Sequence, residues 1–274
     1  MLKKLLRNVL SPGDRKAIDA VEFPLELEEK LGAIHSTAPV DRHLEILFRD
    51  VEIGGENFAQ LFQRCLSETH TPLTPFNVFH RFQSRRDLLQ YFFSSLDIPG
   101  ARAECGVYRG ATALLLARAW RSRNAAFDGR GLYLIDSFVG TSASGERDLI
   151  PVRDGNSLRH EPFFKVAQAG LTPELVRGYF AQFPQVEICA DWIPQVFKPL
   201  SELRWAFVHL DVTLYAPTLA ALEYFYPRLN RGGVIVCDGS PFCPGARAAW
   251  DEFCGKQNIR HVVLGNRETV LIRE

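Results

Sequence analysis

The chain has 274 residues, and 46% of them are hydrophobic, which suffices for the core of one α/β domain with an extension or of two small domains. Basic and acidic residues number 32 each, so the formal net charge is zero, and this balance argues against a protein that binds nucleic acid through phosphate attraction. No apolar run approaches the roughly 20 residues that cross a bilayer, so we expect no membrane span.

The 6 cysteines form no C-x-x-C pair and show no regular spacing. Cys105, Cys189 and Cys237 fall inside or at the ends of apolar runs, where a cysteine acts as a small core residue. This pattern favours reduced thiols over a disulfide framework or a zinc site, and it predicts a cytoplasmic protein.

The N-terminal region is expected to be helical and irregular, with no strand pattern. Residues 1–10 mix basic residues with leucines, which indicates a short amphipathic helix on the protein's own surface rather than a membrane anchor. Two further helices are expected at 24–31 and 56–66, where apolar residues recur at helical spacing.

A domain boundary is predicted at T-P-L-T-P, residues 71–75, which separates a helical N-terminal extension (1–75) from a second domain (76–274). After a helix at 85–95, strands and helices alternate. The expected strands are 103–105, 131–136, 186–190, 206–211 and 234–238, and the expected helices are 112–122, 173–183, 217–229 and 244–254. Because helices bound most of these strands, we expect a parallel sheet covered on both faces.

The chain ends with a predicted antiparallel pair of strands. Residues 260–264 and 268–272 have strand character, and Gly265-Asn266 between them is typical of a hairpin turn. The expected fold is therefore α/β, a doubly wound, mostly parallel seven-stranded sheet with an antiparallel C-terminal hairpin, preceded by the helical extension.

A glycine turn follows the first predicted strand of the second domain. The sequence A-E-C-G-V-Y-R-G runs from a buried strand through Gly106 and Gly110 into a helix, so that bare backbone can approach a ligand. The next strand ends in Asp136. A glycine turn after one strand and an acid after the next is how a parallel sheet holds a nucleoside. The alternative is that the two glycines only form a tight connection between strand and helix.

The spacing of the glycines narrows the kind of nucleoside ligand. Dinucleotide enzymes use G-x-G-x-x-G, whereas Gly106 and Gly110 stand further apart. The wider spacing suits a ligand without a pyrophosphate at the turn. S-adenosylmethionine is such a ligand, because an amino acid takes the place of the second nucleotide.

The segment 141–161 is polar, rich in Gly, Ser, Arg and Asp, and without periodicity. We interpret it as a long loop that forms a lid over cofactor and substrate, because loops of this length are usually functional. A solvated surface loop is the alternative.

Four ordered stretches of the second domain carry the most specific signal. They read E-C-G-V-Y-R-G from Glu104, D-S-F-V-G from Asp136, H-L-D-V-T-L-Y from His209 and L-N-R-G-G-V-I-V-C-D-G from Leu229. Together they resemble the macrocin and mycinamicin O-methyltransferase family, whose patterns are roughly E-x-G-V-x-x-G, D-S-F-x-G, L-D-x-D-x-Y-x-x-T and G-G-x-x-x-x-D-D-Y. The resemblance extends from about residue 75 to residue 274. The terminal hairpin is similar to that of class I methyltransferases.

The resemblance implies an activity and partners. Members of that family transfer a methyl group from S-adenosylmethionine to a hydroxyl, often on a sugar of a natural product, with help from a magnesium ion. For this chain the resemblance implies a small-molecule acceptor, and it permits a homo-oligomer.

The resemblance also implies which residues bind the cofactor. Glu104 and the turn from Gly106 through Tyr108 to Gly110 would face its methionine part. Asp136 would accept hydrogen bonds from both ribose hydroxyls, a role that suits a carboxylate because it only accepts. The alternative for Asp136 is a helix N-cap.

Two further pairs of residues would complete the cofactor site. By the same resemblance, Ser137 and Phe138 would lie beside the adenosine. Asp191 and Trp192 follow the third strand, where such enzymes contact the adenine. Simple core packing is the alternative for Trp192.

Asp211 and Asp238 stand at the ends of the fourth and fifth predicted strands, where ligands of an open α/β sheet bind. Converging carboxylates suit Mg²⁺, which would coordinate the acceptor hydroxyl and lower its pKa, and Asp211 would also take the proton. The sequence departs from the family pattern here. Gly239 stands where a second aspartate is expected, and Thr213 replaces the second acid of L-D-x-D. The predicted magnesium site therefore has few protein ligands, and one expected ligand is absent because residue 239 is a glycine.

Without a metal ion, another group has to activate the acceptor. His209 is one candidate because its ordinary pKa lies near neutrality. The alternative is a structural role inside the sheet, since His209 shares a strand face with Asp211. His80 and His160 belong to predicted loops from which they would approach the acceptor, and Tyr215 would line its pocket or cap the next helix.

Three functions remain open from the sequence. The first is an S-adenosylmethionine-dependent O-methyltransferase acting on a sugar or polyhydroxylated natural product. The second is a cofactor-binding protein without methyl transfer, which the missing aspartate at Gly239 motivates. The third is a metal-independent methyltransferase with a different acceptor, such as an amine or a carboxylate.

Overall fold

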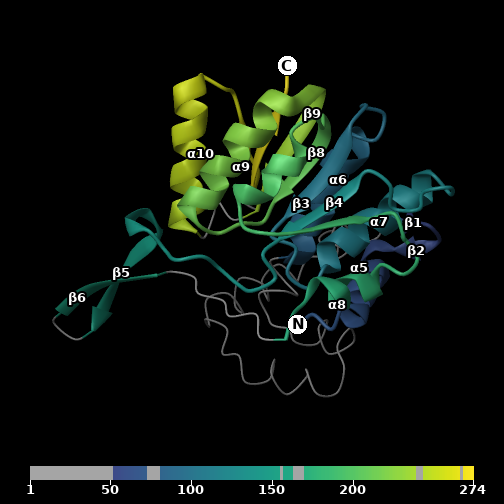
Figure 1. Ribbon diagram of the computed structural model, residues 1–274, viewed down its shortest axis with the longest axis horizontal. Coiled ribbons are helices and arrows are strands. Elements are labelled where there is room, and N and C mark those ends of the chain that lie inside the picture. The colour runs from purple at the N-terminus through teal and green to yellow at the C-terminus, as the bar shows by residue number, and fades with distance from the viewer. Residues whose placement is uncertain (1–51, 73–80, 155–156, 163–169, 239–242, 266–267) are drawn as a thin grey trace, which may run out of the picture. The chain divides into compact units, whose positions relative to one another are not determined.

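The computed structural model describes residues 52–72, 81–154, 157–162, 170–238, 243–265 and 268–274 (Figure 1). The chain divides into two compact units, residues 1–82 and 83–274. The helices expected at 1–10 and 24–31 lie outside the described residues, as do His80 and Gly239. The domain boundary expected at 75 stays a prediction.

In the first unit a short hairpin precedes a helix. β1 (Glu52–Ile53) pairs antiparallel with β2 (Glu56–Asn57), and the two glycines between them, Gly54 and Gly55, have φ angles of 62° and 87°. The expectation of no strand in this region is therefore wrong. Strands of two residues are too short to show the alternation by which a strand is recognised in a sequence.

Helix α5 (Phe58–Glu68) confirms the helix expected at 56–66. It begins after Asn57, whose side chain accepts a hydrogen bond from the backbone N–H of Gln60 at 2.9 Å and so satisfies one of the donors that a helix start leaves unpaired. Its apolar stripe is buried, as the helical spacing predicts. The buried residues are Phe58, Leu61, Phe62, Cys65 and Leu66.

The second unit is built on a seven-stranded sheet with the order β10-β11-β9-β8-β3-β4-β7. The strands are β3 (Ala101–Cys105), β4 (Leu132–Asp136), β7 (Glu187–Ala190), β8 (Trp205–Leu210), β9 (Leu229–Cys237), β10 (Val262–Val263) and β11 (Thr269–Ile272). The pairs among β7, β4, β3, β8 and β9 are parallel, and β11 and β10 are added antiparallel. The predicted fold class is confirmed.

Helices cover both faces of this sheet, so its parallel strands are shielded from water. The helices are α6 (Arg81–Ser94), which enters this unit at Gln83, α7 (Ala111–Arg123), α8 (Pro173–Tyr179), α9 (Tyr215–Phe225) and α10 (Pro244–Gln257). In Figure 1, α9 and α10 lie on one side of the sheet, and α6 and α7 lie on the other.

The side chains of β8 show how the two faces differ. All residues of this strand are buried. Val208 and Leu210 belong to the apolar cluster that includes the buried side chains of α9 and α10. Phe207 points to the opposite layer, where its ring lies 5.2 Å from that of Phe92 in α6. Because alternate residues share a face, His209 is directed to the α6 side as well.

The sequence misplaced the start of β9. A helix was expected to reach residue 229 and a strand to begin at 234, but α9 ends at Phe225 and β9 already begins at Leu229. The polar and glycine residues at 230–233 hide the strand signal, because they alternate neither in size nor in polarity. The pairing of β8 with β9 shifts register between Trp205 and Phe207, beside this irregular stretch.

The long loop expected at 141–161 contains regular structure, so that expectation is wrong in part. A 3₁₀ turn, η2 (Glu146–Asp148), leads into a hairpin of β5 (Leu149–Asp154) and β6 (Ser157–Pro162), which extends away from the seven-stranded sheet (Figure 1). Pro151 and several charged residues weaken the strand pattern. The dipeptide Asp154-Gly155 was the available hairpin signal.

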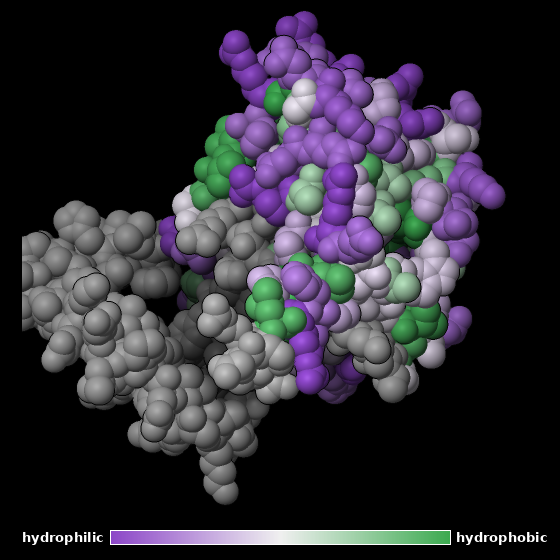
Figure 2. All heavy atoms as spheres, turned by 90° about the vertical axis from the view of Figure 1, so that its left-hand side faces the viewer, coloured by the Kyte–Doolittle hydropathy of each residue, from purple (hydrophilic) through white to green (hydrophobic). Residues whose placement is uncertain are grey.

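Among the helices that the structure describes, none combines the length and the apolar character that crossing a bilayer requires. The face on the α10 side is mostly hydrophilic, with hydrophobic side chains in small separate patches (Figure 2).

Candidate functional site

The glycine turn after β3 runs against the end of β8. Gly106 has a φ of +86°, and a Cβ at this position would lie 2.2 Å from the backbone carbonyl oxygen of Asp211. The backbone N–H of Asp211 donates to the carbonyl oxygen of Cys105 at 2.8 Å. Only a residue without a side chain allows this approach, so Gly106 sets the turn directly beside Asp211.

The same turn leads into α7 through a second special residue. Gly110, with a φ of +88°, precedes the first residue of α7, and the ring of Phe180 lies 3.1 Å from where its Cβ would stand. Tyr108 between the two glycines also has a positive φ, 51°. A non-glycine residue in this region is uncommon and points to a turn that its surroundings hold in place.

Asp136 is held at the end of β4 by backbone amides. One carboxylate oxygen accepts a hydrogen bond from the N–H of Tyr108 and the other from the N–H of Phe138, each at 2.8 Å. The carboxylate is partly exposed and does not cap a helix. Two oxygens offer about four acceptor positions, so these amides leave room for a hydroxyl donor of a ribose.

The pKa of Asp136 lies above its ordinary value. Burial is the main cause, because it disfavours the charged form, and the nearby charge of Asp211 adds to the increase. The backbone amides of Phe138, Tyr108 and Val107 oppose it by bonding to the carboxylate. The two aspartates therefore interact electrostatically across the end of the sheet.

The residues after β4 and β7 lie next to Asp136. Ser137 donates its hydroxyl to the carbonyl oxygen of Gly140 at 2.9 Å, and the Phe138 side chain is buried although its φ is +58°. The N–H of Asp191 donates to the carbonyl oxygen of Asp136 at 3.2 Å. Trp192 is 40% exposed, so core packing does not account for its position.

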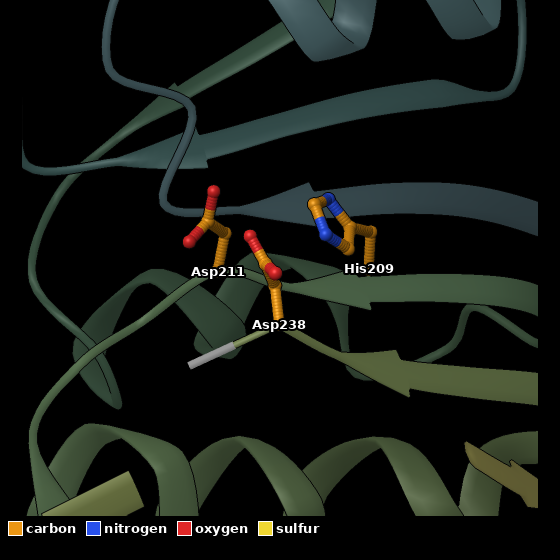
Figure 3. A group of neighbouring side chains, drawn as sticks. All are labelled: His209, Asp211 and Asp238. Carbon is orange, nitrogen blue, oxygen red and sulfur yellow. The ribbon is translucent and has the colours of Figure 1, made fainter. Parts of the chain in front are cut away.

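A second group of polar side chains lies at the ends of β8 and β9 (Figure 3). Potential metal-binding atoms of His209, Asp211 and Asp238 all lie within 4.8 Å of one another. In Figure 3 the three side chains project on the same side of the sheet, His209 from within β8 and the two aspartates from beyond the strand ends. The prediction that Asp211 and Asp238 lie close together is confirmed.

Arg85 of α6 lies between the two aspartates, and no motif in the sequence indicated it. Its Nη2 lies 2.8 Å from Asp211 Oδ2, and its Nη1 lies 2.8 Å from Asp238 Oδ2. Its Nε donates to the hydroxyl of Thr112 at 2.8 Å, and Glu268 of the loop before β11 lies 3.8 Å from Nη1. The Arg85 side chain has no exposed surface.

The charge of Arg85 follows from its neighbours. Burial alone would lower its pKa, but the carboxylates of Asp238, Asp211 and Glu268 hold the pKa above its ordinary value. Arg85 is therefore a permanent cation inside the protein. A buried charge of this kind persists only when it is paired and hydrogen-bonded.

A signal for Arg85 existed in the sequence. Arg85, Leu88, Leu89 and Phe92 follow the i, i+3, i+4, i+7 spacing of one helix face, and all of them are buried. An arginine on an apolar face requires an acidic partner, because arginine is almost never fully buried unpaired. The partners are 126 and 153 residues away, so the spacing alone does not identify them.

His209 and Glu104 form a buried pair on adjacent strands. Nδ1 of His209 lies 2.9 Å from Oε1 of Glu104, and the two side chains are 0% and 1% exposed. Neither His209 Nε2 nor Glu104 Oε2 has another hydrogen-bond partner in the described part of the chain. The pair joins β8 to β3 two residues before Asp211. This contact agrees with the alternative that His209 has a structural role inside the sheet.

Another acidic residue anchors the segment before the hairpin. Asp148 is buried, and its carboxylate accepts hydrogen bonds from the N–H of Tyr215 at 2.7 Å and of Gly145 at 2.8 Å. Tyr215 begins α9, so the carboxylate lies where a helix start favours negative charge. A Cβ on Gly245 of α10 would collide with Asp148 at 1.7 Å. One carboxylate thus contacts the beginnings of both helices.

A cavity of about 340 Å³ opens beside this anchor. It is lined by residues 143–148 and 214–217. Arg147 lies over the ring of Tyr215, 4.4 Å from its centroid, and pairs with Glu252, which also accepts the Tyr215 hydroxyl at 2.7 Å. Tyr215 therefore lines this cavity and is the first residue of α9, whose N-cap is Leu214, so the alternative of a helix cap is wrong and its place in the acceptor pocket stays a prediction. His160 is exposed on β6.

The strand-end residues are poorly suited to hold a magnesium ion. One oxygen of Asp211 and one of Asp238 already bond to the guanidinium of Arg85. Thr213 stands at a position where a further carboxylate was expected, and His209 offers nitrogen, whereas Mg²⁺ prefers oxygen ligands. A cation bound to both aspartates would also be placed close to a buried positive charge.

The sheet order, the antiparallel C-terminal pair and the glycine turn facing strand-end aspartates define a class I methyltransferase fold. Residues 80–265, more than half of the chain, match the model of the macrocin O-methyltransferase (TylF) family. The chain belongs to this family, and the resemblance found in the sequence is confirmed.

Two curated relatives are similar to this chain. Demethyldecarbamoylnovobiocin O-methyltransferase of Streptomyces niveus is 27% identical over 169 residues, which cover 60% of this chain and 61% of the relative. The 8-demethyl-8-(2,3-dimethoxy-alpha-L-rhamnosyl)-tetracenomycin-C 4'-O-methyltransferase of Streptomyces olivaceus is 28% identical over 161 residues, 56% of this chain and 59% of the relative. The chain thus spans about three fifths of the length of these curated relatives.

Two solved structures share the fold. The O-methyltransferase NovP is 22% identical with a TM-score of 0.55, covering 70% of this chain and 80% of its own. CalS11, a calicheamicin methyltransferase, is 18% identical with a TM-score of 0.57, covering 82% of this chain and 95% of its own.

Proposed function

We propose that this chain is an S-adenosylmethionine-dependent O-methyltransferase that acts on a hydroxyl of a sugar or of a polyhydroxylated natural product. The observation that carries the proposal is a pair of contacts made by the glycine turn after β3. Gly106 packs against the backbone of Asp211, and the N–H of Tyr108 binds the carboxylate of Asp136. An acid suited to a ribose and an acid suited to a proton transfer thus lie at the same edge of one sheet, where ligands of this fold bind.

The cofactor half of the proposal uses Asp136 and the turn. Asp136 would accept both ribose hydroxyls with the acceptor positions that Tyr108 and Phe138 leave open. The backbone from Gly106 to Gly110 would face the methionine part of the cofactor. When bound, S-adenosylmethionine supplies an electrophilic methyl group on a positively charged sulfur.

The contacts of the other cofactor-site residues are proposed from their positions in the fold. Ser137 and Phe138 would lie beside the adenosine. The exposed indole of Trp192, next to Asp191 at the end of β7, offers a face for the adenine.

The chemical half of the proposal uses Asp211. Asp211 would accept the proton of the acceptor hydroxyl while the hydroxyl oxygen forms a bond to the methyl carbon and the bond between that carbon and sulfur breaks, leaving S-adenosylhomocysteine. His209 and Glu104 are buried beneath it, so we assign them the support of β8 against β3 rather than contact with the ligands. No step of this reaction passes through a magnesium ion.

The class of acceptor is inferred from the relatives. Their names describe the O-methylation of demethyldecarbamoylnovobiocin and the 4'-O-methylation of a tetracenomycin that carries a dimethoxyrhamnosyl group. A sugar hydroxyl is uncharged and weakly acidic, so it requires a base such as Asp211 to become a nucleophile. A homo-oligomer and a cytoplasmic location stay predictions of the sequence.

Calorimetry and a methyl-transfer assay test the proposal. Titration with S-adenosylmethionine should show binding in the micromolar range, and Asp136→Asn should weaken it. Methyl transfer is then measured by mass spectrometry with TDP-rhamnose and demethyldecarbamoylnovobiocin as acceptor probes. No binding at millimolar cofactor would overturn the proposal. Binding without transfer to any hydroxyl probe would favour a cofactor-binding protein, and transfer to an amine or carboxylate probe would favour the other acceptor classes.

A further inference from the structure

We propose that Arg85 takes the place of a resident divalent cation between Asp211 and Asp238, so that this methyltransferase positions its base with a guanidinium and works without a metal ion. The inference rests on the proposed function, because it concerns the base of that reaction.

The guanidinium of Arg85 binds two carboxylates at once. Nη1 and Nη2 each reach one aspartate at 2.8 Å, so the two carboxylates bind separate nitrogens of one planar group. The third nitrogen, Nε, is bonded to Thr112 in the first turn of α7. Nη1 also donates to the hydroxyl of Ser84 at 3.2 Å. All three nitrogens are therefore held, and the plane of the guanidinium is fixed relative to both strand ends.

The electrostatics of the cluster favour a permanent cation at this place. Asp211 and Asp238 bond to Arg85, and Glu268 lies 3.8 Å away. Such carboxylates repel one another unless a positive charge lies among them, and the guanidinium supplies it from within the chain.

The sequence changes at this site agree with the loss of a metal ion. The family pattern has carboxylates at the positions of Thr213 and Gly239, and this chain has neither. Two carboxylates are left, and one oxygen of each already accepts a hydrogen bond from Arg85. Mg²⁺ needs near-octahedral oxygen coordination, and a competing guanidinium at hydrogen-bond distance from both ligands prevents them from closing around it.

Arg85 is a positioning residue, since it acts through Asp211 and does not have to touch the acceptor. It orients the Asp211 carboxylate and places a positive charge between it and two other acids. Lysine does not replace it, because a single ammonium lacks the fork that spans both carboxylates and Thr112.

The activity test uses Arg85→Lys and Arg85→Ala, with Arg86→Ala as the control on the next, half-buried position of the same helix. Wild-type methyl transfer to TDP-rhamnose or demethyldecarbamoylnovobiocin should change less than about twofold between EDTA and excess Mg²⁺. Arg85→Lys should lower kcat on the order of 100-fold with little change in the KM of the acceptor. Millimolar methylguanidinium should restore part of the activity of Arg85→Ala, an effect that a purely structural role does not produce.

The binding test does not require an acceptor, so it separates this inference from the proposed function. Electron paramagnetic resonance is recorded with Mn²⁺, which accepts oxygen and nitrogen ligands, on the wild type and on Asp211→Asn. We expect no bound Mn²⁺ on the wild type at submillimolar concentration. Bound Mn²⁺ that Asp211→Asn abolishes, or wild-type transfer that EDTA stops and Mg²⁺ restores, would overturn the inference.

Folding of the variants is checked by circular dichroism before either test. If the Arg85 variants do not fold, the wild-type and Asp211→Asn measurements alone decide the question, since each gives a metal-bound or a metal-free result. Absence of cofactor binding in calorimetry would contradict the proposed function, but it would not affect the interpretation of the Mn²⁺ measurement.

Discussion

Two acids at the same edge of one sheet are held in different ways. Asp136, the last residue of β4, is bound by the backbone N–H groups of Phe138 in its own turn and of Tyr108 in the neighbouring one. Asp211, after β8, is bound by a charged side chain from α6, 126 residues earlier in the chain. The first arrangement needs a particular backbone shape and tolerates many side chains. The second depends on one arginine.

The difference matches the two roles that we propose. A cofactor-binding acid has to stay in one place and accept hydrogen bonds, and backbone amides provide a fixed frame for that. The proposed base lies among other carboxylates that repel it, and a neighbouring cation offsets that repulsion. The two regions meet at Gly106, whose turn supplies the amide for Asp136 and packs against the backbone of Asp211.

The largest expected effect comes from removing the cation. Arg85→Met should lower the free energy of unfolding by about 3–5 kcal/mol, because it leaves buried carboxylates without their counter-charge. Urea denaturation measures the change. Arg86→Met, on the half-buried neighbouring position, should cost far less. Equal losses in the two variants would mean that the arginine bonds add nothing at the Asp211 end of the sheet.

The next effect concerns the turn that joins the two regions. Gly106→Ala places a Cβ 2.2 Å from the carbonyl oxygen of Asp211 at a φ of +86°, and we expect a loss of stability on the order of 2 kcal/mol or more. Gly170→Ala is the matched control, since Gly170 has a φ of +76° and no atom within 4 Å of its Cβ position. The excess loss at Gly106, measured by thermal and urea unfolding, reports the contact. A loss of stability in Gly106→Ala no larger than that in Gly170→Ala would mean that the contact between the turn and Asp211 does not join the two regions.

The smallest expected effect is a pH dependence at Asp136. Burial raises its pKa, so protonation begins at higher pH than for an exposed aspartate. Only the ionised carboxylate accepts both ribose hydroxyls, and affinity for S-adenosylhomocysteine should therefore fall as pH decreases through that raised pKa, by at most about tenfold per pH unit. Calorimetry from neutral to acidic pH measures this fall. Asp136→Asn should bind weakly with no such slope, and an equal slope in that variant would assign the titration to another group.

The features that the sequence predicted are those set by neighbouring residues. The strand, Gly106 and the following helix, and Asp136 at the end of the next strand, depend on short-range patterns, and the structure contains each of them. The parallel pairing of the central strands also followed, because helices between strands enforce it. Position at a strand end was sufficient to bring Asp211 and Asp238 together.

The features that the sequence did not predict depend on distant partners. Arg85 carried a pattern, an arginine on an apolar helix face, but nothing in the spacing says which acids it meets. The pair of Glu104 and His209 joins two strands far apart in the sequence, and no local pattern indicates it. The hairpin of β5 and β6 lacks the alternating apolar residues by which a strand is recognised.

One measurement tests most directly the claim that the two acids divide binding from chemistry. S-adenosylhomocysteine is titrated by calorimetry into the wild type, Asp136→Asn and Asp211→Asn, all shown to be folded. The account predicts a loss of affinity of roughly 10- to 100-fold for Asp136→Asn, from weakened charge-assisted hydrogen bonds, and a change of less than about threefold for Asp211→Asn. Unchanged binding in Asp136→Asn together with lost binding in Asp211→Asn would contradict it.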